Sequence, residues 1–294
     1  MIYYFLPDRG IFGGVKVACR FIEMIISLGG KGTIVLPEGI APQWFPVSVP
    51  VMKEEKALPL VKKDDWVMIT WPPDYRRLNS LTARLVCHCQ GTDELMDEIF
   101  ADYSCWILTC WRQASDYVME KFNRPTTHVG ISIPDCFFYD GAPKLDNRVA
   151  YMPRRGFPIV RACMRRCHGL DFDPLDGLDE HEVSRRLKRA GIFIATSVGE
   201  QFGLPALEAM AAGCLVISVP VKGGFEYLLH KRNCLISEPT ELAETLRWVT
   251  LPENEALRIR LRSQAIATSL RYRRIQQLRL LKDQTNTSLR GLFA

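Results

Sequence analysis

The chain has 294 residues, of which 47% are hydrophobic and 24% charged, and its net charge is +5. This is an ordinary globular composition with room for two hydrophobic cores. No apolar run is long enough to span a membrane, and residues 1–6 lack the basic start of a signal peptide. The ten cysteines are scattered without the spacing of a disulfide module, which favours a reduced, cytoplasmic protein.

The first part of the chain alternates short apolar runs with helical periodicity. The pattern predicts, in order, a strand at 2–6, a helix at 15–28, strands at 33–36, 66–70, 85–89 and 106–110, and a helix at 112–121. Gly29-Gly30 ends the first helix. The segment 37–63 contains five prolines, so we expect it to be mostly loop.

A second alternating series follows residues 140–144, which form the best linker candidate. The pattern predicts a strand at 149–152, helices at 157–167 and 180–190, a strand at 192–195, a helix at 204–212 and a strand at 215–218. Strands that alternate with helices imply parallel sheets with crossover helices. We therefore predict an α/β fold with domains at 1–144 and 145–256, followed by basic helices at 257–294.

Two glutamates, Glu200 and Glu208, lie in a predicted strand–loop–helix unit, one in the loop and one in the helix. Pro205 fits the first turn of that helix, where no amide partner is lost. Loops at the carboxyl ends of parallel strands, facing a helix N-terminus, bind phosphorylated ligands in α/β proteins. A carboxylate there would repel phosphate but would grip the hydroxyls of a sugar or a ribose.

These residues resemble a known family. The run Ser-x2-Glu-x-Phe-Gly-Leu-Pro-x-Leu-Glu-Ala-Met-Ala-x-Gly at 197–213 is similar to the donor-sugar motif of retaining glycosyltransferase family 4. Gly-Gly-Phe-Glu-Tyr at 223–227 resembles that family's Gly-Gly-x-Glu element. The match is dense over 192–236 and loose before 149. It implies two Rossmann-like domains facing across a cleft, the second trimmed and holding most of the donor. The alternative is an ordinary βαβ unit with two surface glutamates.

The resemblance assigns the motif residues to the donor. It implies that the carboxylate of Glu200 lies beside the donor sugar ring and takes part in catalysis. Glu208 would grip the ribose hydroxyls, and the amides of Phe202, Gly203 and Leu204 would face the sugar and phosphate.

Outside the motif, the resemblance implies further contacts to the donor. Arg154 and Arg155 stand where the family has an arginine and a downstream lysine on the diphosphate, but this lysine is missing here. Either Arg155 or Arg161 could take the place of this lysine on the diphosphate.

The glycine loop at Gly13-Gly14 would lie near the diphosphate, although a plain turn is the alternative. His88 would lie near the reacting centre, although a structural histidine is as common. Glu226 would orient the site or cap a helix.

The implied reaction transfers a hexosyl or pentosyl group from a nucleoside-diphosphate sugar, with retention, to a glycan, lipid-linked or other hydroxyl. We expect a front-face displacement that needs no metal and no cofactor besides the donor. The Asp-x-Asp at 171–173 is interpreted as a loop. The cysteine clusters at 87–89 and 163–168 lack a second ligand pair, so metal sites are not predicted.

Two other enzymes stay open: a nucleotide-sugar epimerase of the same architecture, and a glycosyltransferase that acts on modified DNA. The epimerase would need an added base. No base-reading module is visible, so a nucleic-acid partner is disfavoured. A binding protein with an inactive glycosyltransferase fold would be expected to lose Glu200 or Glu208, and both are present.

The C-terminal segment is rich in basic residues with apolar residues interleaved. The basic residues are Arg258, Arg260, Arg262, Arg271, Arg273, Arg274, Arg279, Lys282 and Arg290. One interpretation is a pair of solvated helices whose apolar face packs back on the protein. The other is attraction to an anionic membrane surface, which would make the protein peripheral on the inner face of the membrane.

Overall fold

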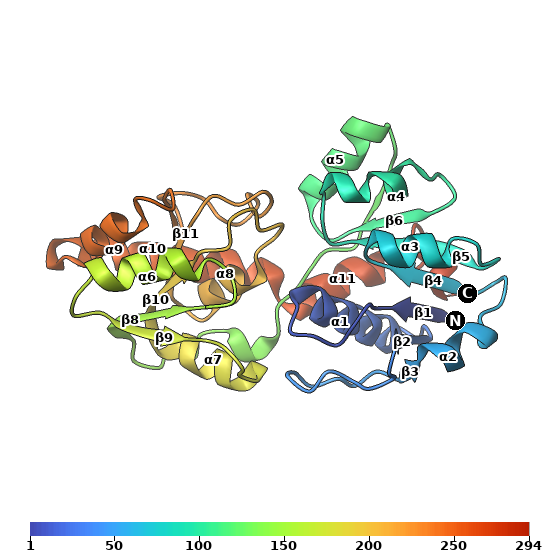
Figure 1. Cartoon of the computed structure of the whole chain (residues 1–294), viewed down its shortest axis with the longest axis horizontal. Coiled ribbons are helices and arrows are strands. Elements are labelled where there is room, and N and C mark those ends of the chain that lie inside the picture. The colour runs from blue at the N-terminus through green and yellow to red at the C-terminus, as the bar shows by residue number, and fades with distance from the viewer. Residues whose placement is uncertain (294) are drawn as a thin grey trace. The chain divides into compact units, whose positions relative to one another are not determined.

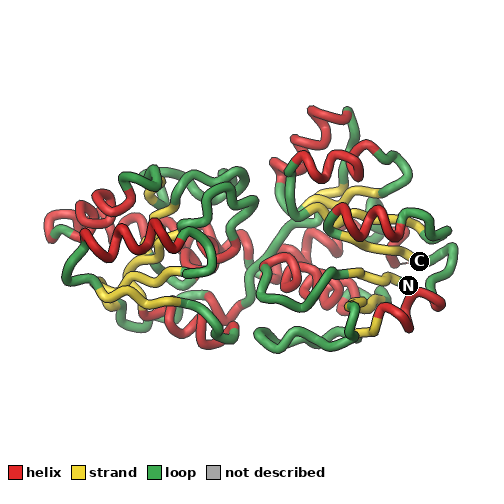
Figure 2. Tube along the Cα trace, viewed as in Figure 1, coloured by secondary structure: helices red, strands yellow, loops and turns green. Residues whose placement is uncertain are grey.

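The computed structural model describes residues 1–293, which divide into two compact units (Figure 1). Unit 1 comprises residues 1–132 together with the C-terminal segment from residue 275, and unit 2 comprises residues 133–274. Each unit is a parallel sheet flanked by helices, as the secondary-structure colouring shows (Figure 2). The predicted fold of two parallel-sheet α/β domains is therefore confirmed.

In the described part of unit 1, seven parallel strands lie in the order β3-β2-β1-β4-β5-β6-β7. Their bounds are β1 Ile2–Phe5, β2 Gly32–Leu36, β3 Val51–Lys53, β4 Trp66–Ile69, β5 Arg84–Cys89, β6 Trp106–Thr109 and β7 Thr127–His128. The interior strand β1 is fully buried, because helices cover both faces of a parallel sheet and its residues are apolar or aromatic throughout.

The helices of unit 1 are α1 Gly13–Ser27, α2 Glu54–Ala57, α3 Pro72–Leu78, α4 Asp97–Ala101, α5 Arg112–Phe122, α11 Arg274–Gln284 and α12 Arg290–Phe293. Helix α1 places Ala18, Phe21, Ile22 and Ile25 in the core, since residues three and four apart share one helix face. Residues 37–63, predicted to be mostly loop, include β3, α2 and a 3-10 turn at Leu58–Leu60. Most of the segment is loop as predicted, and the edge strand β3 within it is too short to leave a detectable periodicity.

In the described part of unit 2, five parallel strands lie in the order β12-β11-β10-β8-β9. Their bounds are β8 Leu145–Tyr151, β9 Asp171–Pro174, β10 Ala190–Ala195, β11 Leu215–Ser218 and β12 Leu235–Ile236. The helices are α6 Phe157–Arg166, α7 Glu180–Arg189, α8 Leu204–Ala211, α9 Leu242–Thr250 and α10 Glu255–Ser269. Short 3-10 turns span Glu94–Met96 in unit 1, and Asp135–Phe137, Pro252–Asn254 and Leu270–Tyr272 in unit 2.

The Asp-x-Asp segment at 171–173 is part of the edge strand β9, so its interpretation as a loop was wrong. An edge strand tolerates polar residues because it has a neighbour on one side alone. Asp171 pairs with Arg148 at 2.9 Å, and Asp173 pairs with Arg186 at 2.9 Å. Both carboxylates therefore have arginine partners within unit 2.

The C-terminal basic segment is divided between the units. Helix α10 packs on α8 and β11 of unit 2, and it buries Arg258, whose guanidinium donates to the carbonyls of Val249 and Leu251. Helix α11 lies in unit 1, where the Gln277 amide donates to the carbonyls of Val129 and Gly130. The units divide at residues 132 and 274, whereas the sequence suggested boundaries at 144 and 256.

Among residues 1–293, no helix is both long and apolar enough to cross a membrane. The ten cysteines are all free thiols, and all but Cys136 are buried. Over the same residues, no group of three or more His, Cys, Asp or Glu side chains is arranged to hold a metal ion.

Candidate functional site

Three loops meet at one edge of the sheet in unit 2, where the strands β8, β10 and β11 end. Because these strands are parallel neighbours, their carboxyl ends lie side by side. The loop after β8 carries Arg154 and Arg155, the loop after β10 carries Glu200, and the loop after β11 carries Gly223-Gly224. The tertiary structure thus gathers residues that the sequence predicted separately.

The first two loops are joined by a side-chain hydrogen bond and by a close approach of their backbones. The Thr196 hydroxyl donates to the carbonyl of Arg155 at 2.9 Å. Gly156 has a φ of 74°, and a Cβ there would overlap the carbonyl oxygen of Thr196. A glycine is required at this position both for its left-handed conformation and for the close approach.

An ion pair links the charged side chains of these two loops. A terminal guanidinium nitrogen of Arg155 lies 3.0 Å from a carboxylate oxygen of Glu200, while Arg154 pairs with Asp176 at 3.2 Å. The Arg155 side chain is 58% exposed and that of Glu200 is 22% exposed. An ion pair this accessible contributes little to stability, so both groups are available to a ligand.

The loop after β11 also contacts the loop that carries Glu200. The backbone amides of Lys222 and Gly223 donate to the carbonyl of Glu200 at 2.9 and 3.3 Å. Gly224 has a φ of 92°, and a Cβ there would lie 2.7 Å from the carbonyl oxygen of Phe202. The Gly-Gly element therefore fixes the loop that carries Glu200.

Tyr227, the last residue of that element, anchors the loop from below. Its hydroxyl lies 2.9 Å from the carbonyl oxygen of Phe202 and 2.6 Å from that of Gly203, so its single proton serves both. Burial raises the pKa of Tyr227 well above its usual value, and the nearby charge of Glu200 adds to this. The hydroxyl therefore stays protonated and remains a donor.

The helix α8 starts at this loop. Its N-cap is Gly203, in a left-handed conformation with φ 85°, and Pro205 lies in the first turn as predicted. The first backbone amides of a helix have no partner within it, so they are directed at whatever lies beyond the N-terminus. Glu208 lies one turn further along and is 4% exposed, so little of its side chain is open to solvent.

Three aromatic rings pack beneath the loop. The ring centroids of Phe202 and Tyr227 are 5.2 Å apart, and Tyr272 lies 6.0 Å from each. Burial, followed by the charge of Glu226, raises the pKa of Tyr272 to about 12. The carbonyl of Glu226 accepts from Arg271 at 3.4 Å. Sequence reasoning missed the roles of Tyr227 and Tyr272, although Tyr227 completes the quoted Gly-Gly element.

In unit 1 the predicted glycines lie where α1 begins, after the carboxyl end of β1. Helix α1 starts at Gly13, and the carbonyl of Gly14 accepts from the side-chain amide of Gln90 at 3.3 Å. Gln90 directly follows β5 and is partly exposed. Sequence reasoning missed this residue, because a lone glutamine after a strand carries no recognisable signal.

His88 lies inside β5 and is completely buried. Its Nδ1 atom is 2.9 Å from the Tyr4 hydroxyl and its Nε2 atom 3.1 Å from the Cys110 sulfur, while the Phe21 ring packs on it. Burial lowers the pKa of His88 to about 3, so the imidazole is neutral at physiological pH. The structure thus gives His88 a place in the core, and its predicted catalytic role stays a prediction without support from this geometry.

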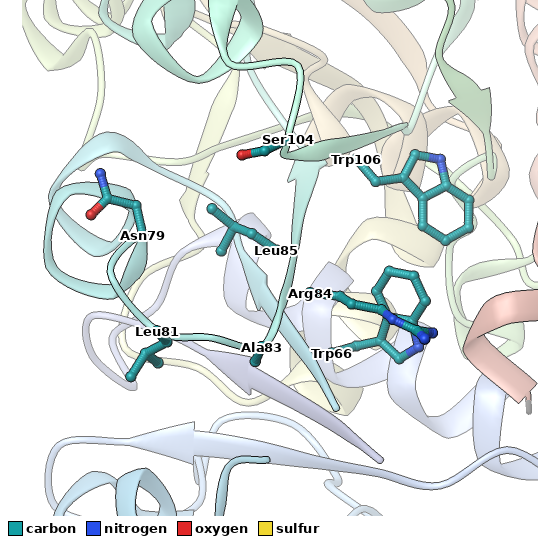
Figure 3. Close-up of a pocket in the computed structure, with 8 residues that line it drawn as sticks. All are labelled: Trp66, Asn79, Leu81, Ala83, Arg84, Leu85, Ser104 and Trp106. Atoms are coloured by element: carbon teal, nitrogen blue, oxygen red, sulfur yellow. The ribbon is translucent and has the colours of Figure 1, made fainter. Parts of the chain in front are cut away.

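A separate cavity of about 530 Å³ lies at the amino ends of β4, β5 and β6 in unit 1 (Figure 3). Trp66, Arg84 and Trp106, the first residues of these strands, line it. The guanidinium of Arg84 lies over the Trp66 ring, and the Trp66 indole donates to the carbonyl of Gly291. Gly14 and Gln90 lie at the carboxyl edge of the same sheet, so this cavity is at the opposite edge from them.

Residues 174–267 match the family model described as Glycosyl transferases group 1. A 50-residue stretch is 44% identical to an alpha-1,6-glucosyltransferase of Actinobacillus pleuropneumoniae, covering 17% of this chain and 15% of that relative. The matched stretch is therefore a small part of the relative's length.

Solved structures resemble nearly the whole chain. A sucrose-phosphate synthase from Thermosynechococcus elongatus has 14% identity, a TM-score of 0.73 and 99% coverage of both chains. HepE from Anabaena, in complex with UDP-glucose, has 13% identity, a TM-score of 0.72 and coverage of 98% and 99%. A glycosyltransferase from Rickettsia africae has 11% identity, a TM-score of 0.68 and 97% coverage of both.

At these identities the structures establish the fold. Together with the family match over 174–267, they confirm the resemblance indicated by the sequence motif.

Proposed function

We propose that this chain is a retaining glycosyltransferase that moves a sugar from a nucleoside-diphosphate sugar to an acceptor hydroxyl. The observation that carries the proposal is the sheet edge of unit 2, where Arg155, in the loop after β8, pairs with Glu200, in the loop between β10 and α8. Cations suit a diphosphate and a carboxylate suits sugar hydroxyls, so one edge offers partners for both parts of such a donor. The Anabaena protein of the same fold was solved with UDP-glucose, which further supports a nucleotide-sugar donor.

The residues of this edge then divide the donor among them. Arg154 and Arg155 hold the diphosphate, with the first amides of α8 at Gly203 and Leu204 directed at the same anion. Glu200 binds the sugar ring and Glu208 the ribose hydroxyls. Phe202 contributes backbone to the loop, and Glu226, beside Tyr272, helps to orient it.

The proposed chemistry is a front-face displacement. The bond between the anomeric carbon and the departing phosphate oxygen breaks, and the acceptor oxygen bonds to the same face of that carbon. The acceptor's proton passes to the departing phosphate oxygen. Negative charge grows on the nucleoside diphosphate, and fixed guanidinium groups stabilise it, so we expect activity to survive excess chelator.

A panel of nucleoside diphosphates and their sugars, tested by thermal shift, examines this proposal. A ligand that binds the folded state alone raises the melting temperature by mass action. We expect one nucleoside diphosphate, and its sugar conjugate, to stabilise the chain, and an adenosine or uridine nucleoside without phosphate to give a much smaller shift. If no nucleoside diphosphate raises the melting temperature above its value in buffer, the proposal is contradicted.

The acceptor is proposed to be a glycan or a lipid-linked hydroxyl. The basic side chains that remain exposed near the C-terminus, among them Arg271 and Arg279, support the second class, since anionic headgroups attract them. Incubation with the identified donor and either a soluble oligosaccharide mixture or an extracted lipid fraction, followed by mass spectrometry of the product, separates the two.

A further inference from the structure

Two hydrogen bonds fix the orientation of the side-chain amide of Gln90. The amide nitrogen donates to the carbonyl of Gly14 at 3.3 Å and to the hydroxyl of Tyr4 at 3.2 Å. A backbone carbonyl can accept but cannot donate, so the NH₂ group of the amide must face Gly14. In the described residues, these bonds use both hydrogens and leave the amide oxygen, Oε1, as the acceptor.

The buried groups behind Gln90 hold this orientation. The Tyr4 hydroxyl accepts from Gln90 and donates its one proton to Nδ1 of His88 at 2.9 Å. The proton of His88 is then on Nε2, which lies 3.1 Å from the Cys110 sulfur. Tyr4, His88 and Cys110 are at most 1% exposed. A series of hydrogen bonds that begins in the core therefore sets the orientation of the partly exposed Gln90 amide.

Gly14 leaves space for the oxygen of that amide. A Cβ at residue 14 would lie 2.7 Å from Oε1 of Gln90. The oxygen thus lies against bare backbone in the first turn of α1, at the carboxyl edge of the sheet to which β1 and β5 belong. Ligands of parallel α/β sheets bind at this edge.

We propose that Gln90 is a sugar-binding residue, whose Oε1 accepts a hydrogen bond from a carbohydrate hydroxyl, and that Tyr4 and His88 are positioning residues that fix its amide. The inference rests on the proposed function, which supplies a sugar as the ligand. A neutral oxygen with a fixed direction suits a hydroxyl donor, and it carries no charge that would repel a phosphate. The hydroxyl belongs either to the donor sugar or to the acceptor sugar, and the experiment distinguishes these sources.

The test uses the full chain and, as donor, whichever of UDP-glucose, GDP-mannose and ADP-glucose the wild type hydrolyses fastest. One arm measures donor hydrolysis with water as acceptor, and the other measures transfer to maltose or to glucose. Gln90→Met keeps the side-chain volume and removes the oxygen. Gln276→Ala, an exposed glutamine of α11 in the same unit, is the matched control.

We expect kcat/KM of Gln90→Met to fall about tenfold, the effect of losing one hydrogen bond to substrate. A fall in both arms assigns the hydroxyl to the donor sugar, and a fall in the transfer arm alone assigns it to the acceptor. Affinity for the bare nucleoside diphosphate should match wild type in either case. Wild-type rates in both arms would overturn the inference, whereas a wild-type chain that binds no nucleoside diphosphate would instead overturn the proposed function.

Tyr4→Phe separates sugar binding from simple support of the fold. It breaks the link to His88 but keeps the Gln90 oxygen and its bond to Gly14. We expect a fall of about threefold in kcat/KM, seen mainly in KM, because the oxygen is present but less well directed. Wild-type kcat/KM and KM in Tyr4→Phe would show that the buried hydroxyl does not direct the amide, and would overturn the positioning role of Tyr4 and His88.

Discussion

The carboxyl edges of the two sheets carry different kinds of side chain. In unit 2 the edge presents charged side chains, and Arg155 and Glu200 pair in the open at 3.0 Å. In unit 1 the cluster formed by Gly14, Gln90, Tyr4 and His88 is uncharged and mostly buried. Charged side chains follow the strands at one edge and a fixed amide follows a strand at the other, so under the proposed function the first edge suits an anion and the second suits neutral hydroxyls.

Glu200→Ala offers the hardest test of the charged edge. We expect turnover to fall by about 10²-fold or more, as for other lost contacts at a reacting centre, because the carboxylate beside the sugar is gone. Affinity for the nucleoside diphosphate should stay equal or rise, since Arg155 is released from its partner. Donor hydrolysis and titration calorimetry measure the two effects, with Glu253→Ala on an exposed turn as control. Wild-type turnover would remove Glu200 from the site.

Glu208→Ala tests the same edge at the ribose. Losing a charge-assisted hydrogen bond costs about 1.5–3 kcal/mol, which corresponds to a roughly 10–150-fold weaker affinity for the nucleoside diphosphate. Alanine is a good helix former, so α8 should persist. Titration calorimetry of the variant with the nucleoside diphosphate measures this affinity. Unchanged affinity would show that the nearly buried carboxylate has no ligand role.

Tyr227→Phe removes the hydroxyl that holds two carbonyls of the charged loop. We expect the free energy of unfolding to fall by about 1–3 kcal/mol, because buried acceptors lose their donor. Urea denaturation measures it. Tyr103→Phe, which removes an exposed hydroxyl bonded to the carbonyl of Phe122, should cost much less. Equal losses in the two variants would mean that the Tyr227 hydroxyl does not anchor the loop.

His88 makes the uncharged edge sensitive to acid. Its pKa is about 3 in the folded chain against an ordinary 6.5, so folding favours the neutral form. Its contribution to stability is complete above pH 6.5 and is lost as pH falls from 6.5 towards 3. Urea unfolding at several pH values should show a shallower decline for His88→Gln than for wild type. The exposed His181→Gln serves as control, and parallel declines for all three would contradict the buried, neutral imidazole.

The smallest effect is expected from the C-terminal arginines. Arg271, Arg273 and Arg274 changed together to Gln should reduce sedimentation with anionic vesicles at low salt. Each basic residue near such a surface contributes about 1 kcal/mol, and salt screens it. Arg273 already packs on Phe138, which limits what it can add. Equal recovery with anionic and neutral vesicles would favour packed helices with solvated arginines and an acceptor outside the membrane.

Local sequence was enough to predict the strand–loop–helix unit. Apolar runs at 192–195 and 215–218 flank it, and Pro205 and the glutamates follow in an order that one supersecondary element imposes. The edge strand β9 was missed, since polar residues on an edge do not alternate clearly. Sequence could also order the predicted domains but not assign α10 and α11 to different units.

The order of residues along the chain is enough to predict the alternation of strands and helices, the motif around Glu200 and the resemblance that it carries. The pairing of Arg155 with Glu200, the support that Tyr227 gives the loop, and the placement of Gln90 rather than His88 at the partly exposed edge are visible only in the folded chain. These contacts join residues far apart in the chain. They depend on which strands become neighbours and on which side chains the core excludes from water, and neither is encoded in local periodicity.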